Sequence, residues 1–249
     1  MAEAAQDLHR LPGARAGRDP SRAIKRGPSR LPPEVVAATQ RERLFDGLVH
    51  TVAQKGYASA RVGDICLAAG VTRPAFYSHF QGKEDAFLAT YRHGTDLLWS
   101  LLETAYTAIP HWPHALRAGL RLLLSVLAGV PNFARMAIVE IDAVGPAGRA
   151  ERDQLLRRFY RFFDGAPRPV ASSPGGLVID HDALLSSVVG GIYATIHRHV
   201  AAGEHERLTE LVPALTYFAL VPFLGPVAAA EVLDSDDGDP PVVGCAHST

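Results

Sequence analysis

Residues 56–88 read GYASARVGDICLAAGVTRPAFYSHFQGKEDAFL, and this stretch decides the fold of the N-terminal part of the chain. Within it, apolar residues recur with the spacing of one helix face, at Val62, Ile65, Cys66 and Ala69. Gly70 follows, and glycine readily takes the left-handed backbone that often closes a helix. The pattern therefore predicts a short helix that ends at Gly70.

A second, very short helix is predicted directly after this turn. Thr72 is a good N-cap, and Pro74 lies in the first turn, where its missing N–H costs little. A helix over 73–79 has barely two turns and is stable only when it is packed, and Phe76 and Phe80 supply its buried edge. The side chains left for other faces are those of Arg73, Ala75, Tyr77, Ser78 and His79. The arrangement is that of a helix-turn-helix with an exposed reading helix.

The stretch resembles the DNA-binding domain of the tetracycline-repressor (TetR) family. The segments that carry the resemblance are Gly56-Tyr57, Asp64-Ile65, Ala69-Gly70-Val71-Thr72, Phe76-Tyr77-Ser78-His79-Phe80 and Lys83-Glu84-Asp85. A lone helix-turn-helix pattern is weak, but this ordered run is specific because each segment has its own physical role at a fixed spacing. The motif covers a minor part of the chain, and the remainder fits the family by pattern.

The resemblance implies base contacts by the start of the reading helix and phosphate contacts by residues around it. The base-contacting positions are Arg73, Pro74 and Ala75, and the phosphate-contacting positions are Tyr77, His79 and Lys83. At Ala60-Arg61 the chain departs from the Thr pair that usually caps the preceding helix. We expect Arg61 to hold a phosphate by charge and Ser59 to supply the cap. The candidate DNA-binding residues are Arg61, Thr72, Arg73, Pro74, Ala75, Tyr77, Ser78, His79 and Lys83.

For two of these side chains, a DNA-binding role is also supported by their chemistry. Arg73 can donate hydrogen bonds to O6 and N7 of guanine, which would favour the correct base over a wrong one by ~1–3 kcal/mol. The alternative is that Arg73 contacts a phosphate without sequence specificity. Lys83 stands at the start of a helix, where the macrodipole disfavours a cation. A DNA phosphate at the same N-terminus would remove that conflict.

Charge is spread unevenly along the 249 residues, although the net charge is only −1. Residues 1–90 carry 13 Lys and Arg against 9 Asp and Glu, whereas residues 91–249 carry 12 against 17. This asymmetry favours a nucleic-acid-binding face on an acidic body, with ordinary charge scatter as the alternative. We expect a disordered basic arm over 1–33, a helix-turn-helix domain over 34–82, a helical effector-binding and dimerisation domain over 83–233, and a disordered tail over 234–249.

The arm has two interpretations, a solvated tail or a segment that reaches the minor groove of DNA. Its cationic residues include Arg15, Arg18, Arg22, Lys25, Arg26 and Arg30. It has no apolar signal-peptide region, so we expect a cytoplasmic protein. The two cysteines, Cys66 and Cys245, are expected to be reduced thiols.

Helical periodicity continues through the rest of the chain, and almost no run alternates with period two, so the expected fold class is all-α. The helices expected outside the 56–88 stretch cover 33–55, 83–109, 113–129, 132–143, 149–164, 181–202 and 207–222. Residues 211–230 form a segment without charged residues, and this segment is long enough to span a membrane. Three prolines interrupt it, and we interpret the segment as a helix buried between subunits rather than in a membrane.

The last two long helices are the candidates for self-association. The resemblance implies that they pair with their mates in a four-helix bundle of a twofold dimer. The candidate interface residues are Leu184, Val188, Gly191, Ile192, Leu215 and Phe218. Such symmetry sets two reading helices about 34–36 Å apart, so the operator is expected to be roughly palindromic.

Large apolar residues in the middle of the chain are the candidates for an effector pocket. The selected lining residues are Trp99, Tyr106, Phe133, Met136 and Tyr160. The identity of the effector does not follow from the sequence.

Catalysis, metal and cofactor binding find no support in the sequence. His197 and His199 are two residues apart on a helix and point in different directions. No nucleophile elbow, phosphate-binding glycine loop or dinucleotide fingerprint is present. Glu140 and Asp142 are expected to be solvated acids on one helix.

The sequence therefore predicts a bacterial, sequence-specific transcription regulator that is not an enzyme. The expected mechanism is a repressor that leaves its DNA operator when a small, mainly hydrophobic effector binds. One alternative is a dimeric DNA-binding protein without an effector. The other is a helical ligand-binding protein or enzyme whose 56–88 stretch only mimics a DNA reader.

Overall fold

The computed structural model describes residues 9–15, 32–167 and 180–235. These residues form two compact units, and within the described ranges their regular structure is entirely helical. Unit 1 comprises Met1–Leu98 and Val130–Glu151, and unit 2 comprises Trp99–Gly129 and Arg152–Thr249. The boundary between the two units falls inside the long helix α5, between Leu98 and Trp99. The all-α fold class is confirmed.

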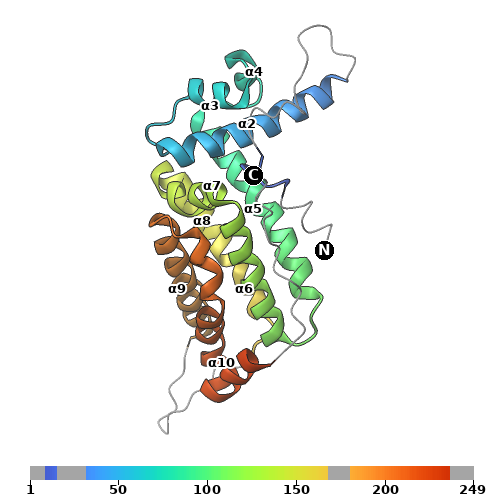
Figure 1. The fold of residues 1–249 in the computed structure, drawn as a ribbon, viewed down its shortest axis with the longest axis vertical. Coiled ribbons are helices and arrows are strands. Elements are labelled where there is room, and N and C mark those ends of the chain that lie inside the picture. Colours follow the sequence, from blue (N-terminus) through green and yellow to red (C-terminus); the bar gives the residue numbers. More distant parts are fainter. Residues whose placement is uncertain (1–8, 16–31, 168–179, 236–249) are drawn as a thin grey trace. The chain divides into compact units, whose positions relative to one another are not determined.

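Unit 1 holds the helix-turn-helix (Figure 1). Its elements are α2 (Pro33–Lys55), α3 (Val62–Ala69), α4 (Arg73–Tyr77), the first part of α5 (Lys83–Thr107), α7 (Pro131–Ala134), the π-helical turn η2 (Arg135–Val139), the 3₁₀ turn η3 (Glu140–Val144) and the start of α8 (Pro146–Arg158). Gly47 lets α2 and α3 approach closely, because a Cβ there would lie 2.7 Å from the backbone nitrogen of Ala69. The close crossing fixes the angle at which the two shorter helices leave α2.

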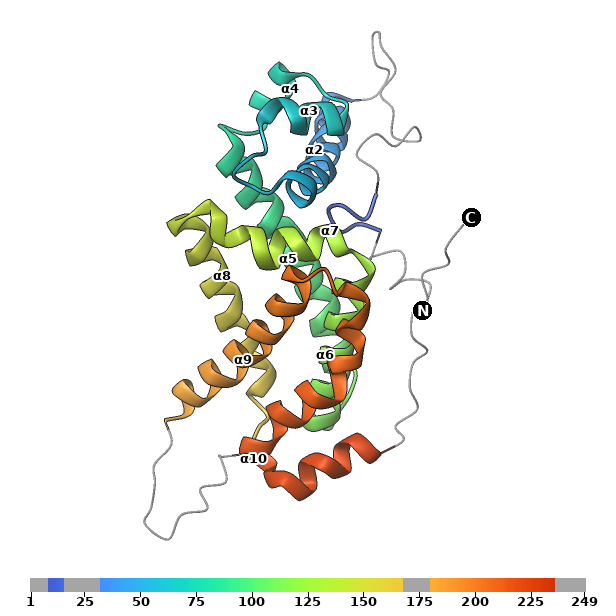
Figure 2. The same ribbon diagram turned by 60° about the vertical axis from the view of Figure 1, so that its left-hand side comes forward.

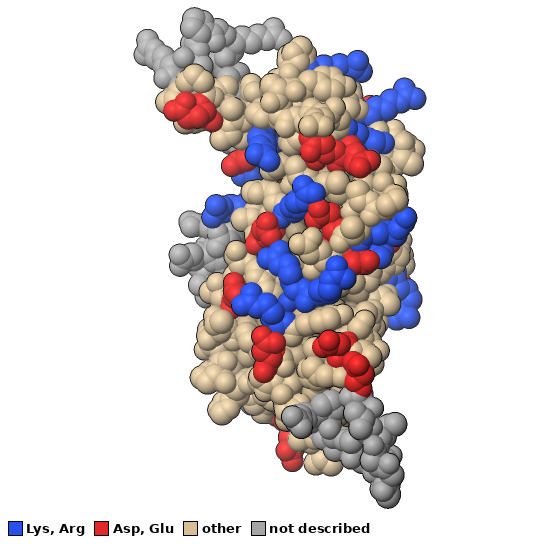
Figure 3. Space-filling model, turned by 180° about the vertical axis from the view of Figure 1, so that it is seen from behind, with Lys and Arg blue, Asp and Glu red and all other residues tan. Residues whose placement is uncertain are grey.

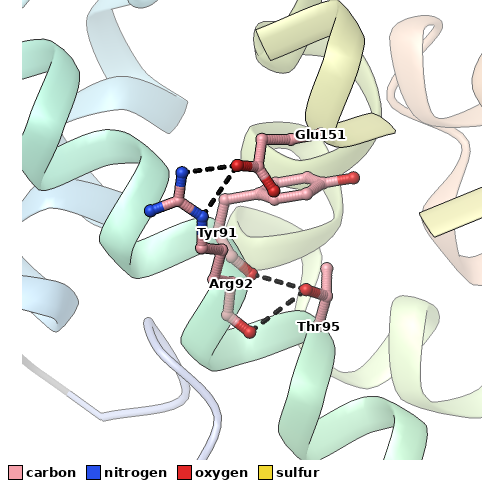
Figure 4. Close-up of polar contacts among 4 residues, drawn as sticks. All are labelled: Tyr91, Arg92, Thr95 and Glu151. Atoms are coloured by element: carbon pink, nitrogen blue, oxygen red, sulfur yellow. Dashed lines mark hydrogen bonds and ion pairs between the residues drawn. The ribbon is translucent and has the colours of Figure 1, made fainter. Parts of the chain in front are cut away.

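An ion pair joins α5 to α8 within unit 1 (Figure 4). The guanidinium of Arg92 donates from Nε and Nη2 to one carboxylate oxygen of Glu151. One turn further along α5, the hydroxyl of Thr95 donates to the carbonyl of Tyr91 at 2.9 Å. The pair is partly exposed, so its contribution to stability is modest.

Residues 9–15 are folded against α2, which corrects part of the prediction of a disordered arm. The Leu11 side chain is fully buried, and the Gly13 N–H donates to the carboxylate of Asp46 at 2.8 Å. The Arg15 guanidinium lies 3.5 Å from Asp46, and the Arg15 carbonyl lies 2.8 Å from Nε2 of His50. A buried leucine and a buried carboxylate partner outweigh the polar composition that suggested disorder. The remainder of the predicted arm, and the predicted tail after residue 235, lie outside the described residues.

Unit 2 contains the remaining helices. They are the second part of α5, α6 (Trp112–Gly129), the end of α8, the 3₁₀ turn η4 (Phe159–Phe163), α9 (His181–Ala201), the 3₁₀ turn η5 (His205–Leu211) and α10 (Val212–Asp234). Figure 2 shows α9 beside α10 and the sharp bend within α10. The bend lies at Gly225, whose φ of 77° is non-helical, and Pro226 disfavours helical backbone in the residue before it.

The sequence predicted most helices, but three of the segments expected outside the 56–88 stretch differ from the prediction. The segment expected over 149–164 is divided between α8 and the 3₁₀ turn η4. The segment expected as one helix over 132–143 passes through a turn of α-helix, a π-helical turn and a 3₁₀ turn. The last helix was predicted to stop at residue 222, but α10 resumes after its bend and continues to Asp234.

One described segment, His205–Asp234, is long and apolar enough to cross a membrane by length and composition alone. A third of its most apolar window is buried among other residues, and the break at Gly225 interrupts it.

Candidate DNA-binding site

The reading helix α4 is held by its buried aromatic edge. Phe76 is fully buried and Phe80 nearly so, with ring centroids 5.5 Å apart. Thr72 caps the helix as predicted, since its hydroxyl accepts the Ala75 N–H at 3.4 Å. The helix ends at Tyr77, two residues earlier than expected. The outer side chains Arg73, Tyr77 and Ser78 are exposed, with 57% of the Tyr77 surface accessible.

Arg73 lies across the start of α3. A Cβ on Gly63 would stand 2.9 Å from Nη2 of Arg73, so the guanidinium occupies the space that a side chain at position 63 would fill. Burial raises the pKa of the Cys66 thiol, and the positive charge of Arg73 lowers it by a smaller amount, so that the pKa is raised overall. The role of Gly63 could not be predicted from the sequence, because a glycine within a helix usually only destabilises that helix.

The cap of α3 comes from Asp64 rather than from Ser59. The Asp64 carboxylate accepts the backbone N–H of Arg61 at 3.1 Å, and its other oxygen lies 2.8 Å from Nζ of Lys55. These hydrogen bonds lower the pKa of Asp64, that to Lys55 most strongly. The predicted cap at Ser59 is therefore wrong, while the Arg61 side chain is exposed and available to DNA.

Lys83 holds the turn between α2 and α3. Its ammonium donates to the carbonyl of Tyr57 at 2.7 Å and stands 4.2 Å from the centroid of the Tyr57 ring. A second carbonyl, that of Ala58, lies 3.5 Å away. These acceptors offset the unfavourable helix dipole without a phosphate, and the third N–H of the ammonium is left for one.

Glu140 is buried, which corrects the expectation of a solvated acid. Its Oε2 accepts the backbone N–H of Tyr57 at 2.8 Å, and its Oε1 lies 3.5 Å from Nη2 of Arg135. Tyr57 is thus held through its N–H by η3 and through its carbonyl by Lys83 of α5. Periodicity missed this contact because the partners are 83 residues apart in sequence.

Comparison with known proteins places this geometry in a family. The model for "Bacterial regulatory proteins, tetR family" matches residues 44–90, which include α3, α4 and their supports. Residues 44–90 are a TetR-family DNA-binding domain. The match ends within α5, so the family model covers the DNA-binding helices and none of unit 2.

Two curated relatives within the TetR family are regulators. The HTH-type transcriptional regulator AcrR of Shigella flexneri is 41% identical over 51 residues, which are 20% of this chain and 24% of that protein. The fatty acid metabolism regulator protein of Bacillus subtilis is 23% identical over 123 residues, which are 49% of this chain and 63% of that protein. The matches thus span about a quarter and under two thirds of these relatives.

Solved structures of TetR-family regulators share the fold over most of the chain. The fatty acid degradation regulator FadR of Bacillus halodurans has a TM-score of 0.63 at 18% identity, covering 79% of this chain and 97% of that one. FadR of Bacillus subtilis, solved in complex with stearoyl-CoA, has a TM-score of 0.60 at 19% identity, covering 73% and 97%.

The predicted effector-pocket residues are divided between the units. Phe133 and Met136 are fully buried in unit 1, where Phe133 fills the space beside Gly94. Trp99, Tyr106 and Tyr160 belong to unit 2. The five residues therefore do not form one cluster within either unit.

Unit 2 has an aromatic cluster gathered around the carbonyl of Phe162. That carbonyl accepts both the Trp112 indole N–H at 2.8 Å and the Tyr106 hydroxyl at 3.1 Å. Burial raises the pKa of the Tyr106 hydroxyl, and the charge of Asp164 adds to the effect. At its edge, the Arg158 guanidinium carbon lies 4.5 Å from the Trp99 ring centroid.

Three predicted dimer-interface residues face the interior of their own protomer. Val188, Ile192 and Leu215 are buried in the single chain and offer almost no surface to a second copy. A Cβ on Gly191 would lie 2.9 Å from the Phe218 ring, so this glycine accommodates a side chain of its own unit. Phe218 itself stays 46% exposed, and Leu184 is partly exposed. The outer face of α9 and α10 is instead formed by Ser186, Ser187, Ala194, Ala214, Tyr217 and Phe218.

Charged side chains are mixed over the surface drawn in Figure 3. On that face, Lys and Arg side chains gather across the middle, with Asp and Glu side chains among, above and below them. The charge asymmetry expected between the two parts of the sequence is therefore not visible there as a simple division.

Proposed function

We propose that this chain is a TetR-family transcriptional repressor that binds a roughly palindromic DNA operator as a homodimer. The observation that carries the proposal is the exposed row of Arg73, Tyr77 and Ser78 on a helix anchored by Phe76 and Phe80. Arg73 reads bases, and the side chains around it contact phosphates. The regulatory roles of the relatives support the proposal. It implies a cytoplasmic location, where operators are found.

The dimer forms through the outer face of α9 and α10. Tyr217 and Phe218 are exposed aromatic side chains, and Gly190 has open space where a Cβ would point. A symmetric pair of such faces would bury the apolar surface and set the spacing of the reading helices.

The effector is an anionic amphiphile that binds unit 2. An aromatic cluster would take the apolar part, while Arg158 and Arg161, whose guanidinium carbons lie 4.5 and 6.0 Å from the Trp99 centroid, would take the charge. Stearoyl-CoA, the ligand in the Bacillus subtilis FadR structure, is a molecule of this kind. This assignment therefore makes acyl-CoA thioesters the first ligands to test.

Release from DNA requires the effector to prefer the conformation that does not bind the operator. Equal affinity for both conformations would shift nothing, however tight the binding. A hundredfold preference corresponds to about 2.7 kcal/mol of coupling, within the usual range for allostery.

The test is selection of the purified chain on a pool of random DNA duplexes. An inverted repeat is expected, and the operator obtained is then titrated with stearoyl-CoA, free coenzyme A or stearate. Release by the thioester alone supports the effector assignment. Specific binding that no ligand weakens favours an effector-independent DNA-binding protein. DNA binding that survives the double change Arg73→Ala and Tyr77→Ala favours a helical ligand-binding protein or enzyme that mimics a DNA reader.

A further inference from the structure

Arg41 of α2 is an exposed cation without a carboxylate partner in the described part of the chain. Its guanidinium carbon lies 5.5 Å from the Phe45 ring centroid and 5.9 Å from the Phe80 ring centroid. The nearby acids Glu42 and Asp46 are instead within ion-pair distance of Arg15. Two aromatic rings therefore hold Arg41 in place while its charge stays available to an anion.

His79 also lies beside the ring of Phe80. Its ring centroid is 6.1 Å from that of Phe80, and the charge of Arg41 reaches it. Among the described residues, Nε2 of His79 is shielded from water and has no hydrogen-bond partner, whereas Nδ1 is not shielded. Burial lowers the pKa of His79, and the charge of Arg41 lowers it further, so the ring is neutral at pH 7.

The environment of His79 also selects its tautomer. A shielded nitrogen without an acceptor is best left unprotonated, because an unsatisfied N–H costs more than an unsatisfied lone pair. The surroundings of Nε2 therefore favour the tautomer that carries its proton on Nδ1. Arg41 and His79 thus present two hydrogen-bond donors beside the reading helix and no acceptor between them.

We propose that Arg41 and the Nδ1–H of His79 together bind one phosphate of the DNA backbone, so that α2 adds a contact of its own to those of the helix-turn-helix. The inference rests on the proposed DNA-binding function. It favours a backbone phosphate over a free anion because His79 follows α4 by two residues, next to the surface that enters the groove. The two side chains contribute differently, Arg41 a charge and His79 a neutral donor.

The test begins with the salt dependence of operator binding for four variants. Arg41→Met keeps the aliphatic packing on the two rings and removes the charge, whereas Arg41→Lys keeps a charge. With two half-sites, Arg41→Met makes the slope of log affinity against log salt shallower by about 1.8, a roughly tenfold change between 50 and 200 mM salt. His79→Ala weakens binding without changing the slope. His79→Asn restores affinity, because its amide nitrogen replaces Nδ1.

Methylphosphonate substitution then identifies the phosphate. Neutralising one phosphate in each half-site is expected to weaken the wild-type protein much more than Arg41→Met, which keeps only the neutral contact from His79. The assignment would be overturned if Arg41→Met had the same salt slope as the wild type. It would also be overturned if, at every phosphate, the affinity lost through neutralisation were the same in Arg41→Met as in the wild type. Wild-type protein that binds no duplex specifically would instead contradict the proposed function. Melting temperatures confirm that each variant is folded, and Arg41→Lys keeps the test decisive if Arg41→Met is unstable.

Discussion

Replacing Glu140 with alanine removes the acceptor that holds the turn between α2 and α3. The Glu140 side chain is only 10% exposed, and its Oε2 accepts the Tyr57 N–H at 2.8 Å. Tyr57 is buried as well, so no water replaces the lost oxygen. Glu140→Ala is therefore expected to leave a buried N–H unsatisfied in the middle of the helix-turn-helix.

The size of the effect follows from the type of bond. A hydrogen bond to a charged group is worth ~1.5–3 kcal/mol, and the partly exposed Arg135 adds less than about 1 kcal/mol. Glu140→Ala is expected to lower the local opening free energy of this turn by about 2 kcal/mol. Glu140→Gln keeps an oxygen at the same position and is expected to cost about 1 kcal/mol or less.

Hydrogen exchange at the Tyr57 amide measures this opening directly. A loss of about 2 kcal/mol lowers the protection of that amide roughly thirtyfold. Glu140→Gln should lower it about fivefold or less, and amides in unit 2 serve as the internal control. Unchanged protection in Glu140→Ala would refute the reasoning. Equal losses in the two variants would show that charge, rather than the hydrogen bond, holds the turn.

Three further predictions follow from single contacts in unit 1. Gly63→Ala is expected to fold normally and change the base preferred by Arg73, because the new Cβ would lie 2.9 Å from its Nη2, and an unchanged selected motif would contradict this. Gly94→Ala should cost ~1–3 kcal/mol, because its Cβ would stand 2.2 Å from a ring carbon of Phe133, and a wild-type melting temperature would disprove that packing. Lys83→Met should lower the urea midpoint through a loss of ~1 kcal/mol, since the ammonium holds a backbone carbonyl, and an unchanged midpoint would argue against that role.

Sequence was sufficient where local chemistry decides the structure. Thr72 caps α4, Gly70 closes α3 in the left-handed conformation, and Phe76 with Phe80 forms the buried edge. Each of these features depends on residues within a few positions of one another. The helix-turn-helix could therefore be predicted from its own 33 residues.

Sequence was insufficient where a partner lies far along the chain. Nothing near Glu140 shows that it meets the Tyr57 amide, and a polar N-terminal segment does not reveal that Leu11 is buried. Periodicity located the apolar face of α9 but could not say what covers it. Val188 and Ile192 are buried within the single chain.

The central claim is that α4 reads bases through its first residue. The most direct measurement is selection from one random duplex pool with the wild-type protein and with Arg73→Ala in parallel. The account predicts an inverted repeat for the wild type and, for the variant, the same repeat with sequence preference lost at one symmetric position in each half-site. An identical motif from both proteins, or no motif from the wild type, would contradict the claim.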